Sequence, residues 1–275
     1  AEKKNIIQLY EAVSVELGDT PFEIFYINMS PAARSPRWLV YKHEPVAHEA
    51  RYTCTEDIEK YLGISFDDNE FDPEELITAI EIVMPKLEKL YNSKVRHYVV
   101  KQHTLLVCRQ FEKYAFELNT KVMNIDLMRL VLAMHDIGKA IDRATQHIYT
   151  QSLIREFWSE SPFTDYELKL VEALLKDDHL GKFFQGKYDC NMLQEEIKKD
   201  AEELQIDASC LLQLKMVLYQ CDIASYTKDA GGLRYLEHMF VYENNKKTFN
   251  EENGLLAMSA DYWSRYKQLK SLIYE

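Results

Sequence analysis

The sequence predicts a mainly α-helical protein with a small α+β region at its N-terminal end. Glycine and proline are scarce, at 8 and 7 of 275 residues, while Leu, Glu and Lys are abundant, a composition that favours helices. Apolar residues recur with helical spacing over most of the chain after residue 74. Short aromatic and β-branched runs separated by turn residues occupy residues 21–54, which is typical of strands.

Residues 1–75 are expected to form a small α+β subdomain of unassigned role. Two strand candidates are separated by SPAARSPR, whose prolines and small residues indicate a loop. The acidic linker SFDDNEFDPEE resembles a calcium loop, but its turn glycine and terminal glutamate are missing at the required offsets, so calcium is not expected there. The expected elements are a helix over 4–17, strands over 21–29, 37–44 and 50–54, a helix over 55–64 and the linker over 65–75.

Residues 76–275 are expected to form one helical domain. Its first helix starts just before this boundary and contains Pro85, which predicts a kink or a break because proline cannot donate the helical hydrogen bond. The expected helices are 74–92, 95–118, 126–138, 145–159, 164–177, 191–204, 209–226, 232–243 and 256–273.

The charge and the cysteines exclude several classes of protein. The formal net charge of −12 argues against a long nucleic-acid partner, because such binders neutralise phosphates with basic residues. The five cysteines are widely spaced without a C-x-x-C pair, which predicts reduced thiols rather than disulfides or a zinc ribbon. No uncharged run approaches the roughly 20 residues that span a bilayer, so we expect no membrane partner and a soluble, cytoplasmic protein. The oligomeric state is left open.

The stretch VLAMHDIGKAID, residues 131–142, places His135 and Asp136 at the end of an apolar helix. Taken alone, this pair is an ordinary helix C-terminus. His103 and Asp222, however, are also polar residues within apolar helical stretches. Metal sites in helical proteins are assembled from side chains on facing helices, and two imidazoles with two carboxylates suit a divalent ion such as Mn, Fe, Co, Ni, Zn or Mg.

These four residues resemble the H…HD…D signature of the HD-domain metal-dependent phosphohydrolases, here in the HDIGK form. HTLLV, beginning at His103, is similar to the first-histidine segment of that family, and CDIAS, containing Asp222, is similar to its last-aspartate segment. The intervals of 32 residues from His103 to His135 and 86 residues from Asp136 to Asp222 also fit. The resemblance covers about residues 95–245. It implies an HD-domain helical bundle in which the four side chains bind a divalent metal.

The resemblance also implies an activity. We expect a phosphohydrolase, a phosphomonoesterase or a phosphodiesterase, that uses a metal-activated water on a small phosphorylated metabolite, most of all a nucleotide. Some branches of the family hold a two-metal centre, and His147 and His179 resemble their additional ligands. Lys139, the lysine of HDIGK, would neutralise a substrate phosphate, although a lysine there also suits the helix dipole.

Three further residues are weaker candidates. Asp178 is a candidate proton shuttle, although it can equally be a solvated surface acid. Arg143 is a candidate phosphate contact, and Tyr226 is a candidate wall of a base or sugar pocket. Two other functions stay open at this point. One is a non-catalytic HD-type module that binds a nucleotide or another ligand, or serves as an interaction platform. The other is a di-iron HD-type oxygenase, which needs all six ligands.

Overall fold

A computed structural model of the chain divides it into two compact units, residues 1–51 and residues 52–275. The boundary lies before Tyr52 instead of near residue 75, because Ile58 and Leu76 are fully buried in the core of the second unit. The structure describes residues 22–27, 37–42, 52–67, 71–96, 98–112, 123–223, 225, 242–243, 246–247 and 260–274.

The first unit contains an antiparallel strand pair. β1 (Phe22–Ile27) pairs with β2 (Arg37–Lys42), so that Phe22 lies opposite Lys42. Both longer strand candidates are thus confirmed, while the expected helix over 4–17 lies outside the described residues. The third candidate is wrong for its described part, because residues 52–54 form no strand. Their Thr53 instead donates its amide to Glu167 Oε1 at 2.9 Å and its hydroxyl to Oε2 at 2.7 Å.

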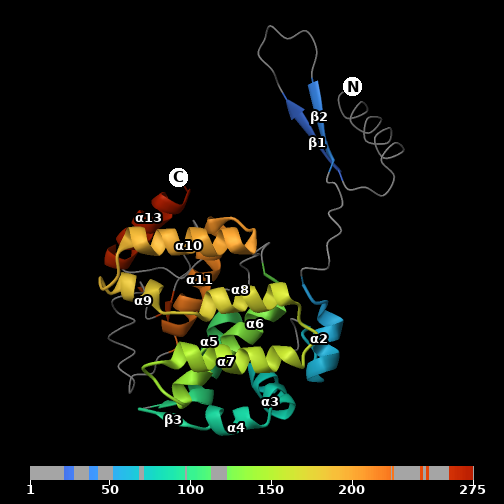
Figure 1. Cartoon of the computed structure of the whole chain (residues 1–275), viewed down its shortest axis with the longest axis vertical. Coiled ribbons are helices and arrows are strands. Elements are labelled where there is room, and N and C mark those ends of the chain that lie inside the picture. The colour runs from blue at the N-terminus through green and yellow to red at the C-terminus, as the bar shows by residue number, and fades with distance from the viewer. Residues whose placement is uncertain are drawn as a thin grey trace. The chain divides into compact units, whose positions relative to one another are not determined.

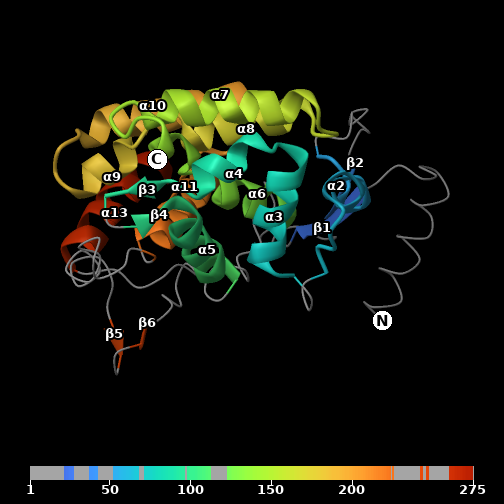
Figure 2. The same ribbon diagram turned by 90° about the horizontal axis from the view of Figure 1, so that it is seen from below.

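The second unit is helical, as the composition predicts. α7 and α8 lie side by side with α6 behind them, and α9, α10 and α13 gather at one end (Figures 1 and 2). The helices are α2 (Thr55–Leu62), α3 (Pro73–Val83), α4 (Lys86–Tyr91), α5 (Val100–Gln110), α6 (Ile125–Met134), the 3₁₀ helix η2 (Ile137–Ala140), α7 (Gln146–Ser159), α8 (Asp165–Leu175), α9 (His179–Phe184), α10 (Cys190–Leu204), α11 (Ala208–Ile223) and α13 (Ala260–Tyr274).

Two expected helices are wrong in part. The helix expected from residue 95 begins at Val100, because β3 (Lys94–Val95) and β4 (Tyr98–Val99) form a hairpin before it. Within the helix expected over 232–243, the described residues Tyr242–Glu243 form strand β5, which pairs with β6 (Lys246–Lys247). Pro85 separates α3 from α4, as expected from its missing amide hydrogen.

The core of the second unit is built around α6. Every residue from Asp126 to Met134 is buried, and the side chains of Leu127, Leu130 and Leu132 are fully enclosed. Each such leucine stabilises the fold by about 1.5–3 kcal/mol relative to an exposed one. The helix expected over 126–138 therefore exists as a buried element, and its C-terminal end is held at a fixed place in the interior.

The five cysteines are free thiols, in agreement with their spacing. Over the described part of the chain, no helix combines the length and the apolar character that crossing a membrane requires.

Candidate metal centre

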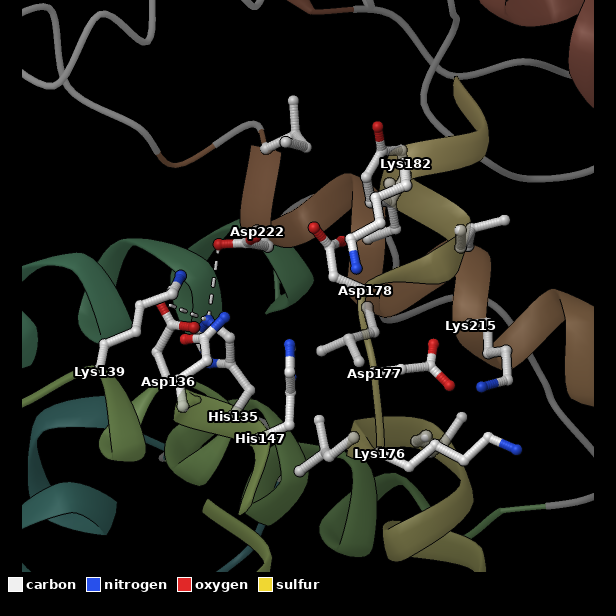
Figure 3. Close-up of a pocket in the computed structure, with 18 of the residues that line it drawn as sticks. His135, Asp136, Lys139, His147, Lys176, Asp177, Asp178, Lys182, Lys215 and Asp222 are labelled. Atoms are coloured by element: carbon white, nitrogen blue, oxygen red, sulfur yellow. Dashed lines mark hydrogen bonds and ion pairs between the residues drawn. The ribbon is translucent and has the colours of Figure 1, made fainter. Parts of the chain in front are cut away.

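Four side chains from three helical segments meet in the second unit. His103 comes from the middle of α5, His135 and Asp136 directly follow α6, and Asp222 lies near the end of α11. One ligand atom from each of the four lies within 4.8 Å of the others. The structure therefore brings together the four residues expected from the sequence, and we refer to them as the His–Asp cluster. Figure 3 shows three of them, His135, Asp136 and Asp222.

The backbone of this segment departs from the helix that the sequence predicts. α6 ends at Met134, and Asp136 has φ −109° and ψ 4°, a sparsely populated region where many active-site residues occur. Next, η2 packs against α7 so closely that a Cβ on Gly138 would lie 2.2 Å from the carbonyl oxygen of Gln146. The Gly138 amide donates to Thr150 Oγ1 at 3.1 Å. The glycine of HDIGK is thus required by packing, and the contact fixes where His135 and Asp136 point.

His135 is oriented as a metal ligand by its own helix. Its Nδ1 lies 2.6 Å from the carbonyl oxygen of Leu132 and donates a hydrogen bond to it, which leaves Nε2 facing the cluster. That buried Nε2 makes no hydrogen bond with any described residue, and the nearest carboxylate oxygens are 3.5 Å away on Asp222 and 3.6 Å away on Asp136. A buried acceptor without a donor is uncommon, and a bound cation would satisfy it.

His103 binds both carboxylates. Its Nε2 lies 2.8 Å from Asp222 Oδ1 and 3.3 Å from Asp136 Oδ2. Burial alone would disfavour a charged imidazole, but hydrogen bonds to Asp136 and Asp222 and their negative charges outweigh burial and raise the pKa of His103 to about 9. At neutral pH a proton on His103 therefore bridges the two carboxylates, at the position where a metal ion would bind.

Lys139 completes the charge balance of the cluster. Its ammonium forms an ion pair with Asp136 Oδ2. Burial opposes the charged form of both carboxyl groups. The nearby Lys139, together with the hydrogen bonds from His103, nevertheless holds the pKa of Asp136 and Asp222 well below the usual range. Both carboxylates are therefore ionised and available as ligands. Two imidazoles and two carboxylates on one buried point can hold a divalent metal ion.

The cluster opens onto a cavity of about 840 Å³. His135, Asp136 and Asp222 line its wall, and so do the basic residues Lys139, Arg143 and Arg96. Sequence reasoning missed Arg96. It lies in the turn of the β3–β4 hairpin, and the sequence predicts a helix at that position. Arg96 could have been predicted as a cavity residue only if these residues had been expected to form a hairpin instead of a helix.

The remaining candidates lie at different places. Asp178 is exposed in the cavity wall, where desolvation by its surroundings and the charge of Asp222 raise its pKa to about 6. Arg143 also lines the cavity and is exposed. Tyr226 lies outside the described residues.

The two additional histidines are separated from each other. His147 points into the cavity between the His–Asp cluster and Asp178 (Figure 3), and desolvation lowers its pKa, which keeps it neutral. His179 lies in another cluster, where Nδ1 is 2.9 Å from Glu196 Oε2 and the ring stacks on Tyr188. The structure thus does not bring His147 or His179 into the His–Asp cluster. A second ion bound by these two histidines stays a prediction.

Comparison of the chain with protein-family models, with curated proteins and with solved structures finds no match. The function is therefore inferred from the side chains of this chain and from their geometry.

Proposed function

We propose that this protein is an HD-type metal-dependent phosphohydrolase that acts on a small phosphorylated metabolite, with nucleotides first among the candidates. The observation that carries the proposal is the meeting of two imidazole nitrogens and two carboxylate oxygens within 4.8 Å, from residues up to 119 positions apart, at the wall of a cavity. His103, His135, Asp136 and Asp222 would hold the ion. A buried His135 Nε2 without a hydrogen bond among the described residues supports this assignment.

The charge around the cluster supports an anionic substrate. Asp136 and Asp222 would balance the two charges of the ion, so the ammonium of Lys139 would leave this end of the cavity positive. Arg96 and Arg143 line the same cavity, although the chain as a whole has a net charge of −12. A local positive field within an acidic protein favours the binding of a phosphoryl group.

The reaction needs a nucleophile and neutralisation of the phosphoryl oxygens. A bound ion would lower the pKa of a water and polarise a phosphoryl oxygen. The water would lose a proton as its oxygen bonds to phosphorus, the ester P–O bond would break, and the leaving oxygen would take up a proton. Lys139 and Arg143 would neutralise the phosphoryl oxygens. Asp178 faces the same cavity with a pKa of about 6, so it can exchange a proton with the reacting groups near neutral pH.

The test is an assay of the purified full chain on phosphomonoesters, phosphodiesters and nucleoside phosphates, with Mn²⁺, Co²⁺ or Fe²⁺ added. The expected result is metal-dependent release of phosphate or of a nucleoside monophosphate. Asp136→Asn should lower kcat/KM by at least about 100-fold. Removal of a residue that only orients a metal ligand costs about 10- to 100-fold, and Asp136 would be a ligand itself. Glu202→Gln, an isosteric change on the exposed face of α10, is the control and should change nothing.

Two results would contradict hydrolysis. A protein that binds a nucleotide tightly and releases it unchanged would favour the non-catalytic ligand-binding module. A coupled di-iron signal in electron paramagnetic resonance, with consumption of O₂, would favour the oxygenase. That alternative requires six ligands around one centre, and the geometry brings four of the six candidates together.

A further inference from the structure

A second group of ligand-type side chains lies away from the His–Asp cluster. Asp177 and His179 belong to the connection between α8 and α9 and to the start of α9, and Glu196 belongs to α10. One ligand atom from each lies within 4.8 Å of the other two. We call these three residues the Asp–His–Glu cluster. It shares no residue with the His–Asp cluster, and Asp177 lies on the far side of His147 from His135 and Asp136 (Figure 3).

Each member of this cluster is held by a contact that leaves a ligand atom available. Asp177 accepts the backbone amide of His179 through Oδ1 at 2.9 Å, and its other oxygen, Oδ2, lies 3.6 Å from His179 Nδ1. Glu196 accepts the hydroxyl of Tyr188 through Oε1, and its Oε2 lies 2.9 Å from the same Nδ1. One oxygen of each carboxylate is therefore anchored while the other faces the imidazole.

Tyr188 fixes two of the three groups at once. Its ring stacks on the imidazole of His179 with centroids 4.2 Å apart and planes 11° apart, while its hydroxyl binds Glu196. Outer contacts that orient an imidazole and a carboxylate in this way are typical of metal sites.

The surroundings leave the cluster rich in negative charge and open to an ion. Asp177 and Glu196 line the cavity, and all three members are partly exposed. Two lysines of the same wall are held by other acceptors. Lys176 pairs with Asp200 Oδ1 at 2.6 Å, and Lys215 donates to the carbonyl oxygen of Ala173 at 2.6 Å.

We propose that Asp177, His179 and Glu196 form a second divalent-cation site, separate from the His–Asp cluster. One imidazole and two carboxylates suit a borderline first-row ion such as Mn²⁺, Fe²⁺, Co²⁺ or Zn²⁺. Three protein ligands leave coordination positions free, and two of the three face the cavity. The site gives His179 a role that does not require His147. It binds its ion whether or not the protein hydrolyses phosphoesters.

The test is a Co²⁺ titration of the metal-free full chain, followed by visible absorption and by equilibrium dialysis. The expected result is one ion for each cluster. Glu196→Gln keeps the size of the side chain but removes its charge, and it should abolish one of the two binding events. Tyr188→Phe keeps the stacked ring and removes the hydroxyl, so it should weaken the same event by about 10- to 100-fold. Glu195→Gln, the exposed neighbour on α10, should bind as the wild type does.

A second variant distinguishes ion binding at the two clusters. Asp222→Asn should remove the other binding event and leave the one that Glu196→Gln abolishes. If Glu196→Gln and Tyr188→Phe, both folded by circular dichroism, bind Co²⁺ as the wild type does, the second site is contradicted. If Glu196→Gln removes all binding and Asp222→Asn removes none, the Asp–His–Glu site stands while the metal assignment of the His–Asp cluster fails.

Discussion

The charge on His103 determines how the metal-free His–Asp cluster is held together. Its proton bridges Asp136 and Asp222, and the pair raises its pKa to about 9, above the ordinary value of 6.5. The folded protein therefore binds this proton more tightly than the unfolded chain does. The stabilisation is fully present below about pH 6.5 and is lost as the pH rises through about 9.

This difference predicts the pH dependence of stability without metal. The free energy of unfolding, measured with urea and a chelator, should be lower at pH 9 than at pH 6. The loss is at most about 3 kcal/mol, since each tenfold change in proton affinity is worth about 1.4 kcal/mol. His103→Gln removes the titrating group and serves as the control, so its stability should change less over this range. A wild-type stability that rises or stays level from pH 6 to pH 9, relative to His103→Gln, would contradict the bridging proton.

The four residues of the His–Asp cluster could be predicted because each is a polar residue within an apolar stretch. This pattern can be recognised in the sequence without knowledge of the packing. The contacts that orient them could not, because the orientation of His135 depends on the carbonyl of Leu132. The same holds for the Asp–His–Glu cluster, where the contacts of His179 with Tyr188 and Glu196 depend on how α9 and α10 meet. Such contacts exist only after packing, so no spacing in the sequence indicates them.

Among the elements, the β3–β4 hairpin places an arginine at a position whose backbone conformation favours glycine. Arg96 adopts φ 54°, in the left-handed region where glycine or asparagine is the usual residue of a two-residue turn. A non-glycine residue there costs about 1–3 kcal/mol. The side chain of Arg96 lines the cavity onto which the His–Asp cluster opens, so we expect this arginine to serve binding and not the turn.

Replacement of Arg96 by glycine should weaken substrate binding without lowering the stability of the fold. Arg96→Gly relieves the backbone, so the free energy of unfolding should stay level or rise by up to about 1 kcal/mol, because glycine also loses entropy on folding. The same variant should raise KM for a phosphorylated substrate by at least about tenfold, since hydrogen bonds to charged groups contribute about 1.5–3 kcal/mol. Arg96→Lys keeps the charge and should raise KM less. A destabilised Arg96→Gly with an unchanged KM would show that the residue serves the turn alone.

Element boundaries were predicted less well than the elements themselves. The sequence pattern continues α6 to residue 138, but the helix ends at Met134 because η2 turns to pack Gly138 against α7. Likewise Val95 and Tyr98 fit a helical pattern, yet they pair across a hairpin. Periodicity reports which residues are buried, while helix ends are set by contacts with other elements.

The second unit as a whole is a scaffold that brings distant segments to one point. α5 contacts both α6 and α11, and His103 thereby meets Asp222, 119 positions later in the chain. The helical class follows from composition and periodicity, but the choice of which helices face each other does not. For the same reason the sequence indicated the metal site with Lys139 and Arg143, but not the cavity, Arg96 or the meeting of His179 with Asp177 and Glu196.

The proposed function depends on the binding of a divalent metal ion by the His–Asp cluster. Anomalous diffraction at the zinc absorption edge, from crystals grown with saturating Zn²⁺, tests this binding. The expected result is a peak about 2.0–2.2 Å from the Nε2 atoms of His103 and His135 and from oxygens of Asp136 and Asp222. Absence of a peak there, with His103 Nε2 still hydrogen-bonded to Asp222, would contradict this binding.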